Sequence, residues 1–450
     1  MNFLSEMQMA TTQLLVLNAS RIKHQDQCHP VAVISPTRGK YATLLPVSRF
    51  MRRIGATHAF SKAAGCALVF FLALSLLDCA HAQQELNIIK HGDFFGEKPI
   101  PVSLEGFTGE AEEVLKFDLY VQGFSFVTPD ADPQYIIKGA GAGNVTGSLE
   151  DNIAKKVLFS RTYSGAGERR QAHAFADDIV GAIRNSKPIG GSKIAYKSQS
   201  PGGSGEIYVA DFDGYNPRQV TSDGAIVAKP AWVPGRMALY YTSYARSNPD
   251  IFYHSLSSGE RRIIAGYSGL NTSAAVSPDG SKVAMILSKM GSPNVWVCNA
   301  DGSDLRRLTK GVEDSSPCWS PDGRWICFAA KINSRRVLAK VPASGGAVER
   351  VPTTGAPNPT EPDWSPDGKW IAFTSQATGF SICIMSADGT ILPVTLVSGQ
   401  DPSWSPNSRT LVFNRGPAGH QSLAVLDVFT RQSRDCRSAP GSNSEPAWSR

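Results

Sequence analysis

One twelve-residue unit recurs along most of this chain and limits what the chain can fold into. Residues 317–328 are Pro-Cys-Trp-Ser-Pro-Asp-Gly-Arg-Trp-Ile-Cys-Phe. Proline fixes φ, aspartate tolerates a bend and glycine supplies φ > 0, so Pro321-Asp322-Gly323 predicts a tight turn. The residues on both sides are rich in aromatic and β-branched types that favour strands. The unit therefore predicts a β-hairpin.

The hairpin unit returns at a nearly constant spacing. Its turn proline falls at residues 234, 278, 321, 366 and 406, which are 44, 43, 45 and 40 residues apart. Each hairpin is followed by a further strand, turn and strand, as in Asn294–Gly302 and the Leu308-Thr309 pair after it. Four short strands per repeat, with a period of about 40–45 residues, are typical of a β-propeller blade. One such sheet buries too little surface to stand alone, so the blades must pack against one another.

The last repeat is split between the two ends of the propeller region. The chain finishes on residues 445–450, which form the first half of a hairpin without a second half. A matching second half lies upstream at Gly191–Lys197. Five full hairpins and this split one predict six blades, with the last strand paired to the first so that no open edge remains. The expected fold is mainly β, with a six-bladed β-propeller over residues 189–450.

The region before the repeats mixes strands with helices. Short apolar segments predict four strands, at Lys98–Leu104, Phe124–Val127, Tyr135–Lys138 and Lys156–Phe159. One helix is expected to begin after a capping Thr108, because acidic residues crowd the turn that follows. Apolar residues at helical spacing from Ala172 to Ile183 predict a second helix. These elements indicate a small α/β domain over residues 83–188, ahead of the propeller.

The beginning of the chain carries an export signal that starts at Met51. Two arginines follow Met51, and an apolar run of 15 residues extends from Ala63 to Leu77. Such a run is shorter than the ~20 residues that a membrane-spanning helix needs. Ala80-His81-Ala82 has the small-residue pattern of a cleavage site. We therefore expect a signal peptide at residues 51–82, cleavage after Ala82 and a periplasmic location.

Two further features of the leader bear on this interpretation. Cys79 raises the alternative of a lipoprotein site, although Asp78 before it is a poor match to the small residue expected there. Residues 1–50 lie upstream of a complete signal, and they are interpreted as an extension produced by a start codon assigned too early. A genuine extension is the alternative.

The charge of the chain resides mostly in this leader. Residues 1–82 hold eight Lys and Arg against three Asp and Glu, which leaves 37 against 36 in the remainder. The mature region therefore lacks the basic field that would recruit nucleic acid.

Five cysteines follow the signal: Cys298, Cys318, Cys327, Cys383 and Cys436. An odd number is a poor disulfide framework, so the main interpretation is that they pack as small apolar residues. If Asp322-Gly323 is a two-residue turn, however, Cys318 and Cys327 face each other across the hairpin. A bridge between these two cysteines stays open as an alternative.

No motif in the mature region predicts catalysis, a cofactor or a metal. Gly139–Asn144 lacks the third glycine and the following helix of a dinucleotide site, and Gly266–Leu270 is not a nucleophile elbow. The histidines show no metal-ligand spacing, at His91, His173, His254 and His420. Asp-Gly pairs recur with the blade period, which indicates turn residues rather than catalytic carboxylates, at 213, 279, 301, 322, 367 and 388.

Segments outside the blades carry a resemblance to a known family. Asp118–Phe124 is similar to Asp-Leu-x-x-Ser-Gly-x-Phe, and Arg170–Asp177 is similar to Arg-x-Ala-His-x-x-Ala-Asp. The strand Lys193–Tyr196 and the segment Val209–Asn216 match as well. With the split last blade, these segments make the whole mature region resemble the TolB family, the periplasmic propellers of the Tol-Pal envelope system. The chain departs from the family in a small domain that is shorter between its second and third predicted strands.

The resemblance implies a binding protein without catalysis or cofactor. It implies a Pal-like lipoprotein bound at one mouth of the propeller and a TolA-like inner-membrane protein bound by the freed amino terminus. Such a system constricts the outer membrane at division, keeps the envelope intact and serves protein import. The amino-terminal segment alternates in polarity, which suits addition to a partner's sheet edge, and its expected binding residues are Glu85, Leu86, Asn87, Ile88 and Ile89. The alternative is that this segment forms the first strand of the small domain.

Two other classes stay open. The first is a propeller-bearing enzyme, either a peptidase or a polysaccharide lyase. A peptidase needs a separate hydrolase domain, for which the chain has no room, and a lyase needs base or metal-binding residues that converge on the channel. The second is a scaffold propeller unrelated to Tol-Pal, and neighbouring genes for Pal-like and TolA-like proteins would distinguish it.

Overall fold

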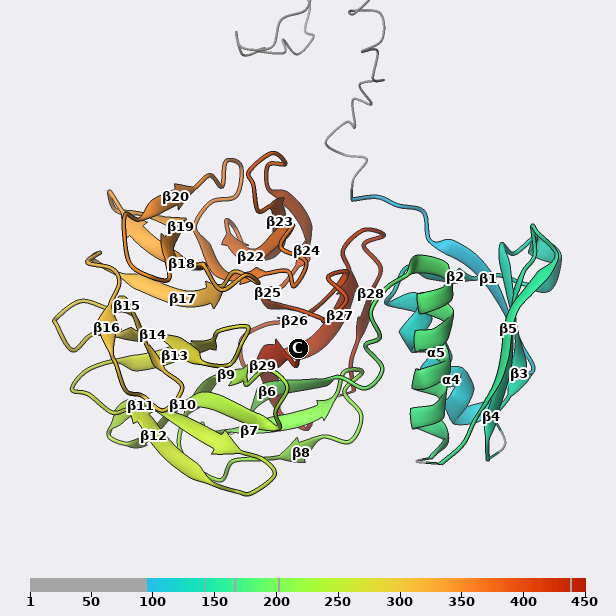
Figure 1. Ribbon diagram of the computed structural model, residues 1–450, viewed down its shortest axis with the longest axis horizontal. Coiled ribbons are helices and arrows are strands. Elements are labelled where there is room, and N and C mark those ends of the chain that lie inside the picture. The colour runs from blue at the N-terminus through green and yellow to red at the C-terminus, as the bar shows by residue number, and fades with distance from the viewer. Residues whose placement is uncertain (1–94, 142, 166, 201–202, 438) are drawn as a thin grey trace, which may run out of the picture. The chain divides into compact units, whose positions relative to one another are not determined.

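The computed structural model describes residues 95–141, 143–165, 167–200, 203–437 and 439–450. The upstream extension, the signal peptide and the expected partner-binding residues Glu85–Ile89 lie outside these ranges. Within them, the chain folds into a small α/β domain and a six-bladed β-propeller (Figure 1), as the sequence predicts. None of the helices in the described ranges has both the length and the apolar character needed to cross a bilayer.

The small domain is one mixed sheet that packs against two helices. Its strands lie in the order β2-β1-β3-β4-β5, with β1 parallel to β2 and β3 and the other pairs antiparallel. The elements are β1 (Ile100–Glu105), α4 (Gly109–Tyr120), β2 (Phe124–Phe126), the 3-10 turn η1 (Pro129–Ala131), β3 (Tyr135–Ala140), β4 (Val145–Asp151), β5 (Lys156–Tyr163) and α5 (Glu168–Arg184). Both predicted helices and all four predicted strands are present, and β4 is an additional strand. Apolar side chains of α4 and α5 share one core with the sheet.

The first helix begins where the sequence predicts but without the expected cap. Thr108 occupies the N-cap position with an extended backbone, yet its side chain makes no capping hydrogen bond. Glu110 and Glu112 lie in the first turn, where a negative charge favours the positive end of the helix dipole. The helix ends at Tyr120, and Gly123 follows with φ of +86°. That backbone conformation favours glycine over any other residue.

Six four-stranded antiparallel sheets form the propeller. Their orders are β29-β6-β7-β8, β12-β11-β10-β9, β13-β14-β15-β16, β17-β18-β19-β20, β21-β22-β23-β24 and β25-β26-β27-β28. The first three blades contain β6 (Lys193–Gln199), β7 (Gly205–Asp211), β8 (Arg218–Gln219), β9 (Val227–Trp232), β10 (Ala238–Arg246), β11 (Asn248–Ser255), β12 (Arg261–Ala265), β13 (Asn271–Val276), β14 (Lys282–Leu287), β15 (Asn294–Asn299) and β16 (Arg306–Arg307).

The other three blades complete the ring. They contain β17 (Asp314–Trp319), β18 (Trp325–Ile332), β19 (Arg335–Pro342), β20 (Glu349–Val351), β21 (Pro359–Trp364), β22 (Trp370–Gln376), β23 (Phe380–Ser386), β24 (Val394–Ser398), β25 (Gln400–Trp404), β26 (Thr410–Arg415), β27 (Ser422–Asp427) and β28 (Ser433–Asp435), and β29 (Ser442–Trp448) returns to the first blade. The innermost strands β9, β13, β17, β21, β25 and β29 contact one another in turn around the centre (Figure 1). Apolar cores fill the spaces between adjacent blades.

The repeated Ser-Pro-Asp-Gly turn forms as the sequence predicts. In the fourth blade the Ser320 hydroxyl donates to the Asp322 carboxylate at 2.5 Å, and the Arg324 N–H donates to the same oxygen at 3.1 Å. These hydrogen bonds favour the ionised form, with the Ser320 contribution the largest, and they lower the pKa of Asp322 to about 2. Each aspartate of this kind therefore holds its turn together, as expected from its periodic placement.

The ring closes through the split blade. β29 pairs antiparallel with β6, so that Ala447 lies opposite Ala195 and Trp448 lies opposite Ile194. Trp448 is 3% exposed, and its indole Nε1 donates to Ser192 Oγ at 2.7 Å. The closure predicted from the two chain segments is confirmed. Because this pairing joins residues about 250 positions apart, it removes the edges that an open ring would expose.

The described cysteines are all buried and free. Cys318 and Cys327 lie directly opposite each other on β17 and β18. The facing register that the sequence left open is therefore present, although the turn is closed by the Gly323 N–H donating to the Ser320 carbonyl at 2.9 Å, around Pro321-Asp322 rather than Asp322-Gly323. Both thiols belong to the same apolar core between blades.

Candidate protein-binding surfaces

The chain that follows the expected partner-binding segment is anchored on the propeller. Phe95 is 1% exposed and lies against Trp370 and Phe429, with ring centroids 5.1 and 6.0 Å away. The Glu97 N–H donates to the Phe429 carbonyl at 3.0 Å. Residues 95–97 therefore pack on the propeller, with the Phe95 ring in its core, before the chain enters β1 of the small domain.

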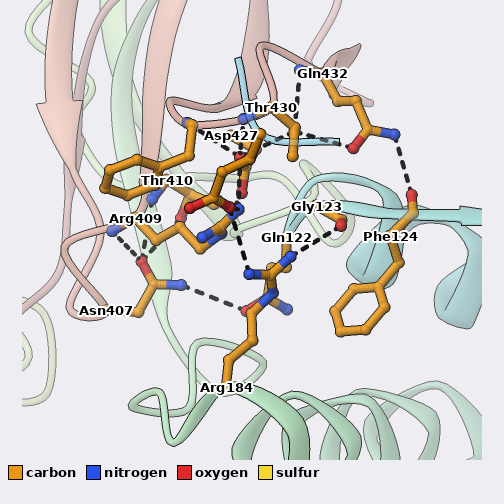
Figure 2. A network of polar contacts seen from close by, with 12 residues as sticks. Gln122, Gly123, Phe124, Arg184, Asn407, Arg409, Thr410, Asp427, Thr430 and Gln432 are labelled. Atoms are coloured by element: carbon orange, nitrogen blue, oxygen red, sulfur yellow. Dashed lines mark hydrogen bonds and ion pairs between the residues drawn. The ribbon is translucent and has the colours of Figure 1, made fainter. Parts of the chain in front are cut away.

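A network of charged side chains joins the two domains beside this anchor (Figure 2). Arg409 donates to both oxygens of the Asp427 carboxylate, at 2.5 Å from Nε and 3.0 Å from Nη2, and it also contacts Glu97 at 3.1 Å. Burial raises the pKa of Asp427, and the Arg409 charge opposes that rise. A buried carboxylate of this kind depends on its guanidinium partner to stay ionised.

A second arginine reaches the network from the small domain. Arg184, at the end of α5, donates to the Gly123 carbonyl at 3.0 Å and lies 3.6 Å from Glu97 (Figure 2). Burial and the neighbouring Arg409 lower the pKa of Arg184. A Cβ atom at Gly123 would lie only 2.6 Å from Arg409 Nη2 and 2.9 Å from Arg184 Nη2, so a larger residue here would displace both guanidinium groups. The Gln432 amide also donates to the Phe124 carbonyl at 3.0 Å.

A separate buried cluster joins the domains at the middle of α5. His173 Nδ1 lies 2.7 Å from the Asp118 carboxylate, and its Nε2 lies 3.5 Å from Asp213 of the propeller. Arg169 forms an ion pair with the same Asp213. Burial opposes a charge on His173, but the two carboxylates outweigh burial and raise its pKa to about 10. The sequence reasoning treated Asp213 only as a turn residue, whereas here it also holds the small domain.

The channel of the propeller is lined by one backbone-strained residue from each innermost strand. These residues have φ between 49° and 56° and interrupt the pairing register of their blades; they are Lys229, Ser273, Ser316, Glu361, Asp401 and Glu445. A bulge of this kind turns one side chain out of the sheet. All six line a cavity of about 390 Å³, which extends to the turn prolines at one end of the ring.

Charged groups converge on this cavity. Lys229 Nζ lies 2.5 Å from Asp401 and 3.6 Å from Glu361, and the Lys229 N–H donates to Glu445 at 2.6 Å. Burial raises the pKa of Asp401 to about 7, because Lys229 only partly offsets the loss of water and the nearby carboxylates. Lys197 lies 3.5 Å from Glu445 on the other side. Each of the three carboxylates is therefore paired within the protein itself.

The two ends of the ring differ in which turns they carry. In each antiparallel blade the turns between first and second strands and between third and fourth strands share one end. The small domain contacts this end, through Asn407 between β25 and β26 and Gln432 between β27 and β28. The opposite end carries the turns between second and third strands and the connections from one blade to the next. We call this opposite end the open face.

Exposed apolar side chains gather on the open face. Val312 is 70% exposed and Met290 is 65% exposed. Four more large apolar residues join them on the strand ends and connections of this face, and the full set is Ile226, Tyr244, Met290, Val312, Ile332 and Phe380. Exposed apolar groups collected in one region are typical of protein-binding surfaces.

Basic side chains accompany this apolar set. The exposed cations of the same turns are Arg246, Lys289, Lys310, Lys331, Arg335 and Arg336. Glu313 lies among them and contacts Lys331 at 3.1 Å and Arg336 at 2.8 Å. The open face therefore combines apolar contact area with an excess of positive charge, which suits a partner with acidic groups at its contact surface.

Sequence reasoning placed a partner at a propeller mouth but did not identify the residues of either mouth. The channel residues had a readable signal, because five of the six stand before a proline and three positions before a tryptophan, as in Lys229-Pro-Ala-Trp232 and Glu445-Pro-Ala-Trp448. The open face had no such signal, because its residues come from turns that differ between blades. Within the described ranges, no group of His, Cys, Asp and Glu side chains is arranged to hold a metal.

Comparisons with known proteins agree with this architecture. Residues 183–450 match the family described as the TolB beta-propeller domain. Two proteins from strains of Anaeromyxobacter dehalogenans, each named Tol-Pal system protein TolB, are 29% and 30% identical over 288 residues, covering 55% of this chain and 65% of each relative. A protein of the same name from Bordetella pertussis is 28% identical over 322 residues, covering 64% of this chain and 72% of the relative.

Among solved structures, TolB from Acinetobacter baumannii superposes with a TM-score of 0.71 at 22% identity, covering 79% of this chain and 97% of that chain. This likeness extends the shared fold beyond the propeller into the small domain. The fold and its surfaces define a six-bladed propeller protein with an amino-terminal α/β domain. Because more than half of its length matches the family, the chain belongs to the TolB beta-propeller family.

Proposed function

We propose that this protein is the propeller component of a Tol-Pal envelope system and acts by binding other proteins. In this proposal the chain is exported to the periplasm, with signal cleavage after Ala82. It docks a Pal-like lipoprotein on the open face and a TolA-like protein through Glu85–Ile89. By linking the two membranes it supports outer-membrane constriction at division, envelope integrity and protein import. The proposed domains are a small α/β domain at residues 83–188 and a propeller at 189–450.

The single observation that supports docking on the open face is the collection of exposed apolar residues there. Val312 and Met290 are among the most exposed large apolar side chains of the described chain. The face consists of turns held by rigid blades, so a partner can bind it with little loss of conformational entropy. The surrounding Lys and Arg side chains favour fast association with an acidic partner and make that association sensitive to salt.

The amino-terminal part of the proposal is supported by the anchor at Phe95. The expected binding residues end six positions before this buried side chain. A segment that precedes this fixed point in the chain can add to the sheet edge of a partner while the described domains stay docked. The role of Glu85–Ile89 therefore does not require the junction of the small domain and the propeller to open.

The test of the open face uses matched pairs of substitutions at its two most exposed apolar residues and at the opposite end. Met290→Glu and Val312→Glu change the open face, whereas Met237→Glu and Val348→Glu place the same charge at exposed positions in turns at the opposite end of the ring. We expect the first pair to weaken capture of the Pal-like lipoprotein by about tenfold or more, as for residues at the centre of an interface. The second pair should leave capture within about twofold of the original. Capture is measured as binding to the immobilised Pal-like lipoprotein. If the second pair weakens capture and the first pair does not, docking on this face is rejected.

The amino-terminal site is tested by deletion. Removing residues 83–89 should abolish capture of the TolA-like protein while the melting temperature and Pal-like binding stay unchanged. If the segment instead forms a strand of the small domain, the same deletion lowers the melting temperature and impairs both interactions together. A shortened protein that captures the TolA-like protein at full strength contradicts the proposal.

A non-catalytic role is supported by the channel. The converging groups that a lyase would need are present, but they are held in ion pairs within the protein: Lys229 contacts Asp401 and Glu361, and Lys197 contacts Glu445. Ion pairing of this kind favours a structural role for these carboxylates. Genes for Pal-like and TolA-like proteins beside this one would favour the proposal over a scaffold propeller of another system.

A further inference from the structure

We propose that Cys318 and Cys327 form a modification site, a dithiol that oxidises to a cross-strand disulfide in the wall of the propeller channel. Neither cysteine has a role in the proposed binding function. The inference stands on their positions in the fourth blade and does not depend on the identity of any partner.

The geometry brings these two residues together. Cys318 of β17 lies directly opposite Cys327 of β18. Residues opposite each other on antiparallel strands have Cα atoms about 4.5–5.5 Å apart, inside the 4.4–6.8 Å range of disulfides. Bridging therefore requires rotation of two side chains and no change of strand pairing.

The other described cysteines have no thiol neighbour of this kind. The Cys298 thiol lies 3.8 Å from the Val283 carbonyl, and the Cys436 thiol lies 3.7 Å from the Phe212 carbonyl. The Cys383 thiol lies 3.5 Å from the Thr395 hydroxyl. Cys383 shares the apolar core of the pair, which makes it the natural competitor and the most informative control.

Access to the pair is one-sided. Cys318 is 8% exposed and lines the channel cavity, whereas Cys327 is fully buried behind it. A small disulfide can therefore reach Cys318 first. Contact with Cys327 and burial raise the pKa of the Cys318 thiol, so its reaction after folding is slow and accelerates with pH. An oxidising compartment, which the proposed export supplies, gives the time that this slow step needs.

The reaction proceeds by thiol–disulfide exchange with a small-molecule disulfide such as oxidised glutathione. The Cys318 thiolate attacks one sulfur of that disulfide and forms a mixed disulfide, while the other half leaves as a thiolate. The Cys327 thiolate then attacks the Cys318 sulfur and expels the second half. The two cysteines are oxidised, the external disulfide is reduced to two thiols, and the two cysteine protons end on those thiols.

The test uses the purified mature protein and oxidised glutathione at pH 8.5. After exposure, the protein is denatured with a thiol-alkylating reagent, and its free thiols are counted by intact mass. We expect the five thiols of the mature chain to fall to three. Trypsin cuts after Lys310, Arg324 and Lys331, so the disulfide should join peptides 311–324 and 325–331, each of which holds one cysteine. Reduction should separate these two peptides.

Alanine variants decide which thiols react. Cys318→Ala and Cys327→Ala should each keep all four remaining thiols free of disulfide within the chain, whereas Cys383→Ala and Cys298→Ala should each lose two. Five alkylated thiols after prolonged exposure, or a linked peptide that contains residue 383, would overturn the proposal. A glutathione adduct that persists on Cys318 beside a free Cys327 would also overturn it.

Discussion

Removal of the Trp448 side chain tests how the propeller ring is closed. The indole is 3% exposed, stacks on Phe212 with ring centroids 5.8 Å apart, and donates to Ser192 Oγ. Replacing a buried tryptophan by alanine costs about 3–5 kcal/mol, through lost burial and the cavity left behind. Ser192 keeps its hydrogen bond to the Ile189 carbonyl, so Trp448→Ala leaves no unpaired hydroxyl and adds little to this figure.

The expected loss is large enough to measure directly. At about 2 °C per kcal/mol, which suits a large domain, the melting temperature should fall by about 6–10 °C. Trp325→Ala is the matched control, because Trp325 is only half-buried and its ring is covered by the Lys340 side chain. Calorimetry of both variants, and of a chain ending at Ser444, should show a small shift for the control and large shifts for the other two. An unchanged melting temperature for Trp448→Ala would mean that pairing of β29 with β6 does not hold the ring closed.

Three further predictions concern the domain junction and the export of the chain. Arg409→Ala leaves Asp427 buried without its counter-ion and should cost about 3–5 kcal/mol in denaturant unfolding, whereas Arg415→Ala breaks an exposed pair with Asp435 and should cost less than about 1 kcal/mol; equal losses would contradict the account of the junction. Because the folded-state pKa of His173, about 10, lies above that of the unfolded chain, its stabilisation is complete below pH ~6.5 and is lost as pH rises towards 10. His173→Gln should therefore lose less melting temperature than the original protein between pH 7 and 9.5, and parallel pH profiles would refute this. The intact mass of the exported protein should match a chain that begins at Gln83, and a lipid on Cys79 or a retained Met1 would contradict the signal assignment.

Much of the fold followed from local sequence. The Ser-Pro-Asp-Gly turns and their period predicted the blades, because turn chemistry depends on a few neighbouring residues. The halves at Gly191–Lys197 and Glu445–Arg450 predicted closure, since each lacks what the other supplies. The missed strand β4 has a weaker signal: Gly147 occupies the middle one of its three buried positions, and the Cβ that Gly147 lacks would collide with Phe175. That constraint comes from a helix that begins some 20 residues later.

Tertiary structure alone decided the surfaces. Residues of the open face come from turns with no common motif, and only the alternation of turn ends around the ring places Met290 and Val312 on the same side. The junction likewise brings Glu97, Arg184 and Arg409 together from three distant segments. Periodic sequence signals report the contacts that every blade repeats. Contacts that occur only once, such as those between one blade and the small domain, leave no periodic signal in the sequence. They can be found only in the folded chain.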